Sequence, residues 1–201
     1  MVSAGGRGTG PLGIFIFRTL PPPPNPMRLE IRDARSSDRA HLIRCLDAMQ
    51  DHMVELDSWN RITRTRDHGS VNLAKLYGHI RRNAGFILVA EADGVPAAAA
   101  FAYLRPLSLA ERTAERPTRS GYLSDLSVLP GWQGLGIGTR LLREVESRFR
   151  REGCDQVGLG VFVPNQGAQR LYQRVGYSPR SIFMVKRLGP ARRRWPRARR
   201  R

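Results

Sequence analysis

The chain has 201 residues, 41% of them hydrophobic, which is enough for one globular domain with a sizeable core. Its formal charge of +17 invites a nucleic-acid function, but much of this excess lies near the two ends. The last 13 residues hold seven arginines and the first 26 hold two, with no acidic residue in either stretch, which leaves +8 for residues 27–188. No apolar run approaches the length that spans a bilayer, so no membrane association is expected.

The cysteines indicate a reduced compartment. Cys45 and Cys154 lie far apart without metal-ligand spacing, and no cleavable signal peptide is evident. We therefore expect a cytoplasmic protein with no metal site. Cys154 follows a glycine at a predicted helix end, and no histidine is placed to activate it, so we interpret it as a packed free thiol rather than a nucleophile.

Two flanking segments have the composition of unstructured chain. Residues 1–26 are rich in glycine and proline, and we expect a disordered extension there. Residues 189–201 resemble a disordered, arginine-rich arm. This arm could bind anionic partners non-specifically through Arg192 to Arg201, or it could be a solvated tail with no dedicated partner. Residues 27–188 are then the folded domain.

The sequence pattern in the first half of this domain predicts a strand, two helices and a β-hairpin. Alternating polarity predicts a strand over Leu29 to Asp33. Ser36 to Asp38 offer N-caps for the first helix, and Ser70 is the predicted cap of a second helix over Val71 to Arg82. Asp93-Gly94 is typical of a tight hairpin turn. The apolar face of the first helix comprises Leu42, Leu46, Met49, Met53 and Leu56, and the hairpin strands are Phe86 to Ala92 and Val95 to Tyr103.

The second half predicts alternating strands and helices, and the whole pattern predicts a mixed sheet with antiparallel members. The polar, basic connection Leu104 to Arg119 is long enough to form a loop on the acceptor side of a site. The predicted elements are strand Leu123 to Val128, helix Gly138 to Glu152, strand Gln156 to Phe162, helix Gln166 to Val175 and a closing strand Ser181 to Lys186.

A glycine-rich turn between the strand ending at Val128 and the next helix carries the first chemical signal. Gly134, Gly136 and Gly138 at a helix start bare successive backbone N–H groups, and the helix dipole favours an anion there. We therefore interpret this turn as a cradle, a set of backbone N–H groups that binds a pyrophosphate. The turn is not a P-loop, because no Gly-Lys-Ser/Thr follows, and it lacks the Gly-x-Gly-x-x-Gly spacing of dinucleotide folds. On this segment alone, a glycine-rich connection without a ligand stays an alternative.

A second motif follows the next predicted strand and reads Asn165-x-x-Ala168-x-x-Leu171-Tyr172-x-x-x-Gly176-Tyr177. In this order and separation, this motif and Gln133-x-x-Gly136-x-Gly138 resemble the GNAT superfamily of acyl-CoA-dependent N-acyltransferases. The resemblance covers Gly121 to Leu188 and reaches back more loosely to Met27. It implies an α+β fold, with a mixed, mostly antiparallel sheet flanked by helices and splayed where CoA enters.

The resemblance also implies how acetyl-CoA is held. The pantetheine arm would bond the backbone of Leu126 and Val128 at the splayed strand, as if adding a strand to an open edge. A backbone N–H of this strand, that of Leu126, would stabilise the oxyanion formed when an amine attacks. Gln133 and Thr139 are candidate pyrophosphate contacts, and Thr139 could equally be an ordinary first-turn residue. Asn165 could bond the pantetheine or cap its own helix.

Tyr172 matches the family's general acid. Its phenol remains protonated at neutral pH and can donate to the departing CoA thiolate. The alternative is a buried aromatic residue whose hydroxyl merely finds a partner, and Tyr177 shares that alternative with less claim to chemistry.

Asp125 is the candidate general base, or an electrostatic contact for the acceptor amine. Many relatives place an acid on the strand before the first motif, sometimes immediately before the position of Asp125, where this chain has Ser124. A structural role for Asp125 therefore also stays open. Glu91 and Asp93 are weaker candidates, since Asp93 already has a turn role.

The resemblance implies direct transfer of an acetyl group from acetyl-CoA to a primary amine of a small molecule or peptide. A non-catalytic acyl-CoA sensor and a nucleic-acid-associated protein that uses the basic tail stay as alternatives, and a homodimer stays open. Acidic residues near the first helix would form an acceptor wall that favours a cationic amine, or simply a solvated face. These residues are Asp47, Asp51, Glu55, Asp57 and Asp67.

Overall fold

A five-stranded sheet organises the part of the chain that the computed structural model describes, residues 27–108, 113, 119–187 and 189. Its strands are β1 (Leu29–Asp33), β2 (Phe86–Ala92), β3 (Val95–Leu104), β4 (Ser120–Val128) and β5 (Gln156–Leu159), in that spatial order. Neighbouring strands from β1 to β4 are antiparallel, and β5 joins β4 in parallel. The helices are α1 (Arg39–Leu56), α2 (His68–Arg82), α4 (Ile137–Arg151), α5 (Gln166–Arg174) and the short 3-10 helix η1 (Ser36–Asp38).

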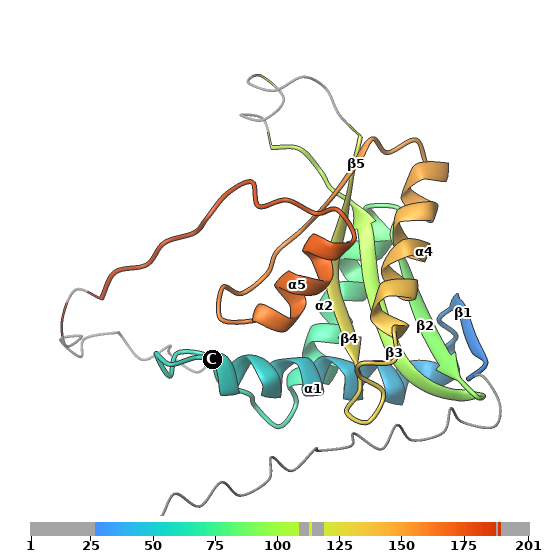
Figure 1. The fold of residues 1–201 in the computed structure, drawn as a ribbon, viewed down its shortest axis with the longest axis horizontal. Helices are drawn as coiled ribbons and strands as arrows, with labels where there is room; N and C mark the ends of the chain where they lie inside the picture. The colour runs from blue at the N-terminus through green and yellow to red at the C-terminus, as the bar shows by residue number, and fades with distance from the viewer. Residues whose placement is uncertain (1–26, 109–112, 114–118, 188, 190–201) are drawn as a thin grey trace, which may run out of the picture.

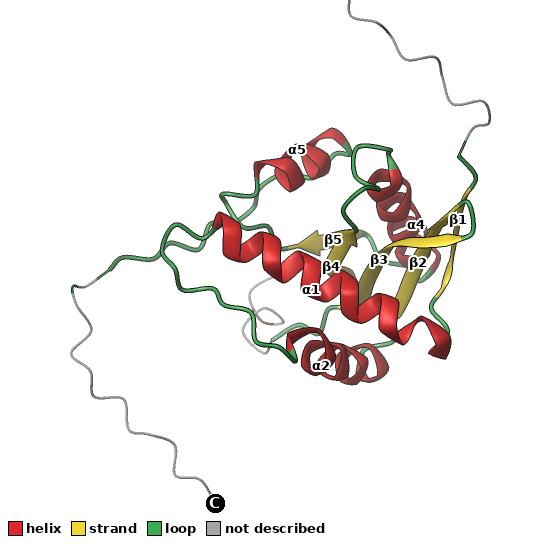
Figure 2. Ribbon diagram, turned by 90° about the horizontal axis from the view of Figure 1, so that it is seen from below, coloured by secondary structure: helices red, strands yellow, loops and turns green. Residues whose placement is uncertain are grey.

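Helices cover both faces of the sheet (Figures 1 and 2). Side chains alternate across each strand, so the sheet has two apolar faces, and each face has its own core. The core under α1 and α2 includes Leu42, Leu73 and Phe101, whereas the core under α4 includes Leu123 and Phe149. α5 packs at the margin of the α4 core through Tyr172 and Val175. The expected mixed, mostly antiparallel sheet flanked by helices is confirmed.

The sheet splits at the middle of β4. Pairing with β5 runs from Ser120 opposite Gln156 only as far as Leu123 opposite Leu159. Pairing with β3 continues to Val128 opposite Ala98. Residues 125–128 are therefore paired with β3, and within the described part of the chain no strand lies on their other side, which is the predicted splay. β5 ends three residues earlier than predicted, because the strand diverges from β4 after Leu159 instead of following it.

A β-bulge lies at the split. Phe101 of β3 is opposite Asp125, but the next residue, Ala102, is opposite Leu123, so Ser124 is the extra residue on β4. A bulge of this kind reverses the side-chain alternation beyond it. Leu123 belongs to the α4 core, whereas Ser124 and Asp125 both line a cavity on the α1 and α2 side. If side chains alternated regularly from Leu123, without the bulge, Asp125 would point to the α4 face.

The helix boundaries differ modestly from the predicted ones. α2 begins at His68, three residues before the predicted start, because Asp67 is its N-cap residue and Ser70 lies inside the first turn, where its hydroxyl donates to the Asp67 carbonyl at 2.9 Å. Gly69 explains the close approach of α2 to α1, since a Cβ there would lie 2.7 Å from the Ile43 carbonyl oxygen. β4 begins at Ser120, earlier than predicted, and so gains its pairs with β5.

The predicted closing strand Ser181 to Lys186 is wrong for this structure. These residues form no strand and are exposed. Instead, the segment leads away from the sheet towards the loop after α1 (Figure 1), where the Arg187 guanidinium lies over the Trp59 ring at 4.7 Å. The predicted extensions at residues 1–26 and 189–201 lie outside the described residues apart from Gly189, as does most of the predicted acceptor-side loop.

Candidate active site

The glycine turn opens α4 with unsatisfied donors. Gly136 is the N-cap residue in the left-handed conformation, with φ +78°, and no side chain caps this helix in the described part of the chain. The first intrahelical bond is donated by the Arg140 N–H to the Gly136 carbonyl at 3.1 Å, so the N–H groups of the preceding turn stay available. Gly134 has φ +77°, and a Cβ on either glycine would meet no atom within 4 Å. Open space in front of free N–H groups suits a phosphate-bearing ligand.

Side-chain contacts hold the glycine turn against the end of β4. The Gln133 amide donates to the Val128 carbonyl at 3.1 Å, so this side chain ties the turn to the end of β4. A Cβ on Gly138 would lie 3.5 to 3.7 Å from side-chain atoms of Leu126, Val128 and Leu171, so the start of α4 lies close to both the split strand and α5. Thr139 occupies the first turn of α4. The predicted cradle residues therefore surround one end of the split.

On the other side of the split, α5 carries the second motif. The Asn165 Oδ1 accepts the Ala168 N–H at 3.0 Å, so Asn165 caps its own helix, one of the two roles that the sequence left open. Tyr172 is half-buried beside Tyr177, with ring centroids 5.8 Å apart. Burial raises the pKa of Tyr172, and the Asp125 carboxylate raises it further. The phenol is thus held in its protonated form within electrostatic reach of Asp125.

A cavity of about 320 Å³ lies on the α1 and α2 side of β4. Among the described residues that line it, Asp125 is the one acid, and Ser124 lies next to it. Most of the remaining polar lining comes from α2, at the i, i+4, i+7, i+11 spacing of one helix face. The sequence interpretation missed these α2 residues, although that spacing was readable. The full lining is Leu46, Met49, Gln50, His68, Asn72, Lys75, Leu76, His79, Tyr103, Ser124 and Asp125.

Asp125 has the environment of a poised carboxylate. Partial burial raises its pKa, while the Ser124 hydroxyl, which donates to Oδ2 at 2.5 Å, and nearby His68 lower it. The net direction is upward, which brings its titration closer to neutral pH and makes the carboxylate a stronger proton acceptor. Tyr103, a cavity neighbour, has its pKa raised mainly by burial.

The acidic residues of the first helix do not form the expected acceptor wall. Asp47 and Asp51 both pair with Arg64, and Asp47 also accepts the Gly69 N–H at 3.0 Å. Asp57 accepts three backbone N–H groups of the following loop, which lower the pKa of its carboxyl. These carboxylates are engaged in holding the connection between α1 and α2. None of the five predicted wall residues lines the cavity.

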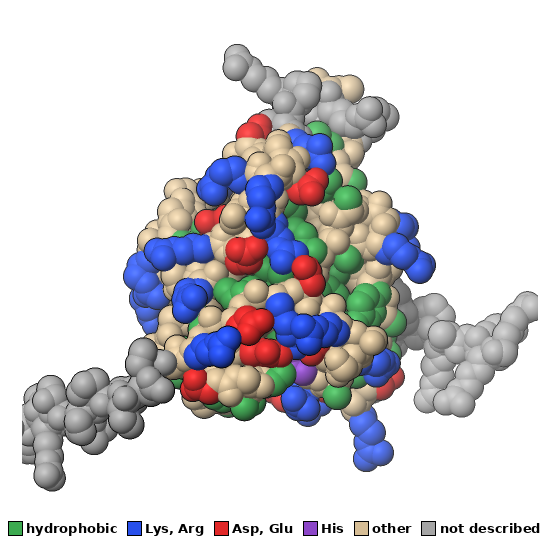
Figure 3. Space-filling model, turned by 90° about the vertical axis from the view of Figure 1, so that its right-hand side faces the viewer, with side chains coloured by type: hydrophobic (Ala, Val, Ile, Leu, Met, Phe, Trp, Pro, Cys, Tyr) green, Lys and Arg blue, Asp and Glu red, His purple; other side chains and the backbone are tan. Residues whose placement is uncertain are grey.

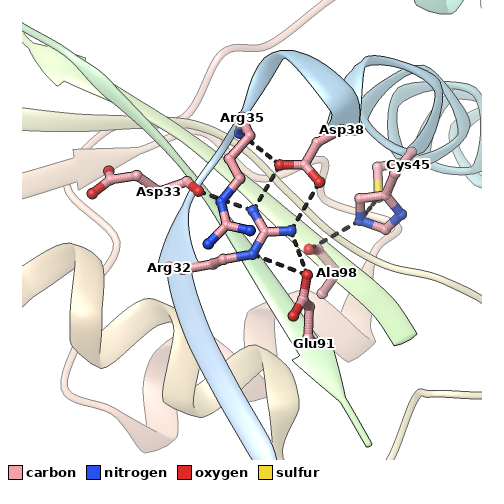
Figure 4. Close-up of polar contacts among 8 residues, drawn as sticks. Arg32, Asp33, Arg35, Asp38, Cys45, Glu91 and Ala98 are labelled. Carbon is pink, nitrogen blue, oxygen red and sulfur yellow. Dashed lines mark hydrogen bonds and ion pairs between the residues drawn. The ribbon is translucent and has the colours of Figure 1, made fainter. Parts of the chain in front are cut away.

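The two weaker base candidates are also engaged elsewhere. Figure 4 shows Glu91 in an ion-pair cluster with Arg32, whose guanidinium also binds Asp38 with two bonds of 2.7 and 2.9 Å. Arg32 thereby joins β1 and β2 to the start of α1. Asp93 accepts the Arg28 N–H at 2.9 Å at the hairpin turn. Neither carboxylate lines the cavity, so Asp125 is the one acid of the candidate set that does.

The two cysteines have the environment of packed thiols rather than of nucleophiles. Both cysteines are free thiols, and burial raises the pKa of Cys45 to about 12 and raises that of Cys154. Within the described residues no cluster of three potential metal ligands occurs, and no helix combines the length and apolar character of a membrane span. On the face drawn in Figure 3, acidic side chains lie among the basic ones, so the folded part shows no uninterrupted basic surface there.

The chain matches known acetyltransferases in sequence. Residues 47–177 match the model of the acetyltransferase (GNAT) family. A mouse thialysine N-epsilon-acetyltransferase is 38% identical over 58 residues, which is 29% of this chain and 34% of that protein. The chain spans less than half the length of the curated relatives it matches.

Solved structures share the fold. A tetramutant of the BH1408 protein from Bacillus halodurans superposes with a TM-score of 0.68 at 22% identity, covering 79% of this chain and 99% of that one. An aminoglycoside N-acetyltransferase, AAC(6')-Iy in complex with CoA, gives a TM-score of 0.59 at 21% identity, covering 82% of this chain and 98% of that one. At these identities the likeness is one of fold.

Proposed function

The chain belongs to the acetyltransferase (GNAT) family, and from this premise we propose that it transfers the acetyl group of acetyl-CoA directly to a primary amine. The observation that carries the proposal is the split beside β4. One side of the split meets the open helix start at Gly136, and the other meets Tyr172 on α5. Asp125, at the same split, lines the cavity on the opposite face of the sheet. A thioester held in the split would lie between a proton donor and a proton acceptor.

Acetyl-CoA fits this arrangement through backbone groups. The pyrophosphate would lie on the free N–H groups of the turn from Gln133 to Thr139, where the helix dipole adds to their attraction. The pantetheine would bond the unpaired edge of β4 at Leu126 and Val128. Since the Gln133 amide already occupies the Val128 carbonyl, pantetheine bonding there would share or displace that side chain.

The chemistry needs two proton transfers. Asp125 accepts a proton from the ammonium group of the acceptor, directly or through water, and its raised pKa suits that task near neutral pH. The amine then attacks the thioester carbonyl, and a backbone N–H of β4 stabilises the oxyanion. Tyr172 donates its phenolic proton to the departing thiolate. No covalent intermediate on the enzyme is needed.

The acceptor that we propose is a small amine that also carries an anionic group. The cavity, about 320 Å³, has the volume of a small-molecule site rather than that of an extended groove. Asp125 would hold the ammonium end, and Lys75 at the exposed rim of the same cavity would hold an anion. A peptide acceptor would enter through its N-terminus or a lysine side chain. Two of the similar proteins are named for amine acceptors: the mouse relative is a thialysine N-epsilon-acetyltransferase, and AAC(6')-Iy is an aminoglycoside N-acetyltransferase.

The test is an amine panel with acetyl-CoA, monitored by release of the free thiol and by mass spectrometry of the product. The panel pairs amines of equal size with and without a carboxylate, and adds aminoglycosides and short peptides. Acetylated product and stoichiometric thiol release support transfer. Binding of acetyl-CoA without turnover of any amine would indicate the non-catalytic sensor instead.

Lys75→Ala tests the acceptor class separately. If an anionic group pairs with Lys75, the variant raises KM for the carboxylate-bearing amine by roughly 10-fold and leaves the uncharged analogue unchanged. Arg82→Ala, on the same helix but outside the cavity lining, is the matched control. Equal effects of Lys75→Ala on both amines would contradict the anionic group while leaving acetyl transfer intact.

A further inference from the structure

The bulge on β4 brings two neighbouring side chains to the same face of the sheet. In a regular strand, consecutive side chains point to opposite faces and do not bond each other. Here Ser124 is the extra residue of the bulge, and both Ser124 and Asp125 line the cavity. The Ser124 hydroxyl donates to the Asp125 Oδ2 at 2.5 Å, a distance typical of a hydroxyl bound to an ionised carboxylate.

The two oxygens of the Asp125 carboxylate therefore differ. Oδ2 accepts the Ser124 hydroxyl, whereas no hydrogen bond reaches Oδ1 from the described part of the chain. Oδ1 is also accessible, since the buried side-chain polar atoms without a partner among these residues are the His41 Nδ1 and the Tyr177 hydroxyl. A carboxylate oxygen that is accessible and unpartnered is suited to accept a proton from a bound ammonium group.

We propose that Ser124 is the positioning residue of the acetyl transfer: its hydroxyl holds Oδ2 of Asp125, so that Oδ1 alone receives the proton of the acceptor. This inference rests on the proposed function, in which Asp125 is the base. As the N–H bond of the ammonium group breaks, the proton passes to Oδ1 and the nitrogen keeps the electron pair that attacks the thioester. The Ser124 proton stays on its own oxygen throughout, and the serine forms no bond to the acetyl group.

The same contact keeps the base ionised. Burial raises the pKa of Asp125, and the hydrogen bond from Ser124 opposes this effect because it favours the charged carboxylate. Without the hydroxyl, more of the carboxyl would be protonated near neutral pH and unable to accept a proton. Ser124 therefore acts on both the orientation of the base and the pH range in which the base works.

Titratable groups of α2, β3 and α5 also line the cavity or act on Asp125. His68 lowers the pKa of its carboxyl. The phenols of Tyr103 and Tyr172 stay protonated near neutral pH, because burial raises their pKa values. The lining residues of α1 carry no charge. A change at Ser124 leaves all of these groups in place, so its own effect can be measured. The full set is His68, Lys75 and His79 on α2, Tyr103 on β3 and Tyr172 on α5.

The first experiment compares the pH profiles of kcat/KM for wild type, Ser124→Ala and Ser124→Thr. In Ser124→Ala, the acidic limb is expected to move up by about 1 pH unit, because a hydrogen bond to the charged form is lost. Above that limb, kcat is expected to fall by about 10-fold, because Oδ1 is no longer held in place. Ser124→Thr keeps a hydroxyl and is expected to restore both.

Ser127→Ala is the matched control, since Ser127 lies on the same strand but contacts Cys45 instead of Asp125. Its acidic limb is expected to coincide with that of the wild type. An acidic limb that does not move in Ser124→Ala, or a Ser124→Thr variant that behaves like Ser124→Ala, would overturn the proposal.

The second experiment needs no turnover. The Asp125 carboxyl is titrated by carbon-13 NMR in the full chain, and its signal is assigned by its loss in Asp125→Asn. Asp125 is expected to titrate about 1 pH unit higher in Ser124→Ala than in the wild type. If no amine is acetylated, the proposed transfer itself fails. If the enzyme is active and Asp125 titrates equally in both proteins, the role of Ser124 alone is overturned.

Discussion

The two sides of β4 present different chemistry to a ligand. On the side of α4 and α5, the prospective contacts are backbone groups: the open helix start at Gly136 and the unpaired edge of residues 124–128. On the side of α1 and α2, they are side chains collected from four elements around a cavity. Backbone contacts depend on a left-handed conformation that a short glycine motif makes accessible without steric cost. Side-chain contacts depend on how distant elements pack, and a single bulge moves Asp125 from one side to the other.

The largest effect is expected on the backbone side. We expect acetyl-CoA to raise the melting temperature and Gly136→Asp to abolish this rise, because a carboxylate at the open helix start would repel the pyrophosphate and an L residue is strained at φ +78°. Thermal denaturation with and without acetyl-CoA measures this. Gly153→Asp is the matched control, since Gly153 has φ +74° and equally open surroundings at the other end of α4. An undiminished ligand shift in Gly136→Asp would show that the cradle lies elsewhere.

Asp125→Asn tests the side-chain contacts on the α1 and α2 side of β4. The variant keeps the size of the side chain but cannot accept a proton, so kcat/KM for the amine should fall by roughly 10²-fold or more with acetyl-CoA affinity intact. Because burial raises the pKa of Asp125, wild-type activity should fall as the pH drops through that pKa, and the variant should lose this acidic limb.

Asp51→Asn is the control for that experiment, because Asp51 pairs with Arg64 outside the cavity, and its kcat/KM should stay within about 2-fold of the wild type. If the acidic limb persists in Asp125→Asn while KM for the amine rises, Asp125 holds a cation and is not the base. Wild-type kcat/KM at every pH would leave it a structural residue.

Tyr172→Phe should have a smaller effect on turnover, up to about 10²-fold in kcat, with acetyl-CoA binding preserved. The reason is that the variant removes only the proton donor for the leaving thiolate. Tyr177→Phe, whose ring lies 5.8 Å from that of Tyr172, is the control for altered packing. Steady-state kinetics with a thiol-release assay measure both. Equal turnover in Tyr172→Phe and wild type would remove Tyr172 from the chemistry.

The smallest effect is expected on stability. It concerns the ion pair between Arg32 and Asp38, which joins β1 to the start of α1. The Arg32 guanidinium, together with the backbone N–H of Arg35, lowers the pKa of Asp38 from 3.8 to about 2, so these contacts stabilise the fold above pH 4 and their contribution is lost as the pH falls through 2. Asp38→Asn should lower the free energy of unfolding by about 2 kcal/mol at neutral pH. In urea denaturation, the difference from wild type should shrink between pH 4 and 2. A difference that does not depend on pH would contradict the ion-pair origin.

Much of the fold follows from local patterns in the sequence. The hairpin strands Phe86–Ala92 and Val95–Leu104 are predicted almost to the residue, because Asp93-Gly94 defines the turn and the flanking apolar runs define the strands. The wrongly predicted boundaries are those of strands whose ends depend on a neighbouring strand. β5 stops at Leu159 because β4 diverges from it, and Ser181 to Lys186 is strand-like in composition but has no strand beside it.

Neighbouring residues explain the glycine turn before α4, because Gly134 and Gly136 tolerate the left-handed conformation that the turn requires, and the two motifs identify the family. Which acid reaches the cavity depends instead on the tertiary structure. Asp47 and Asp51 had the better local pattern for an acceptor wall, yet Arg64 engages both, and the unpatterned Ser124 bulge brings Asp125 to the cavity instead. A glycine turn is a property of neighbouring residues, whereas the partner of a carboxylate is set by segments far away in the chain.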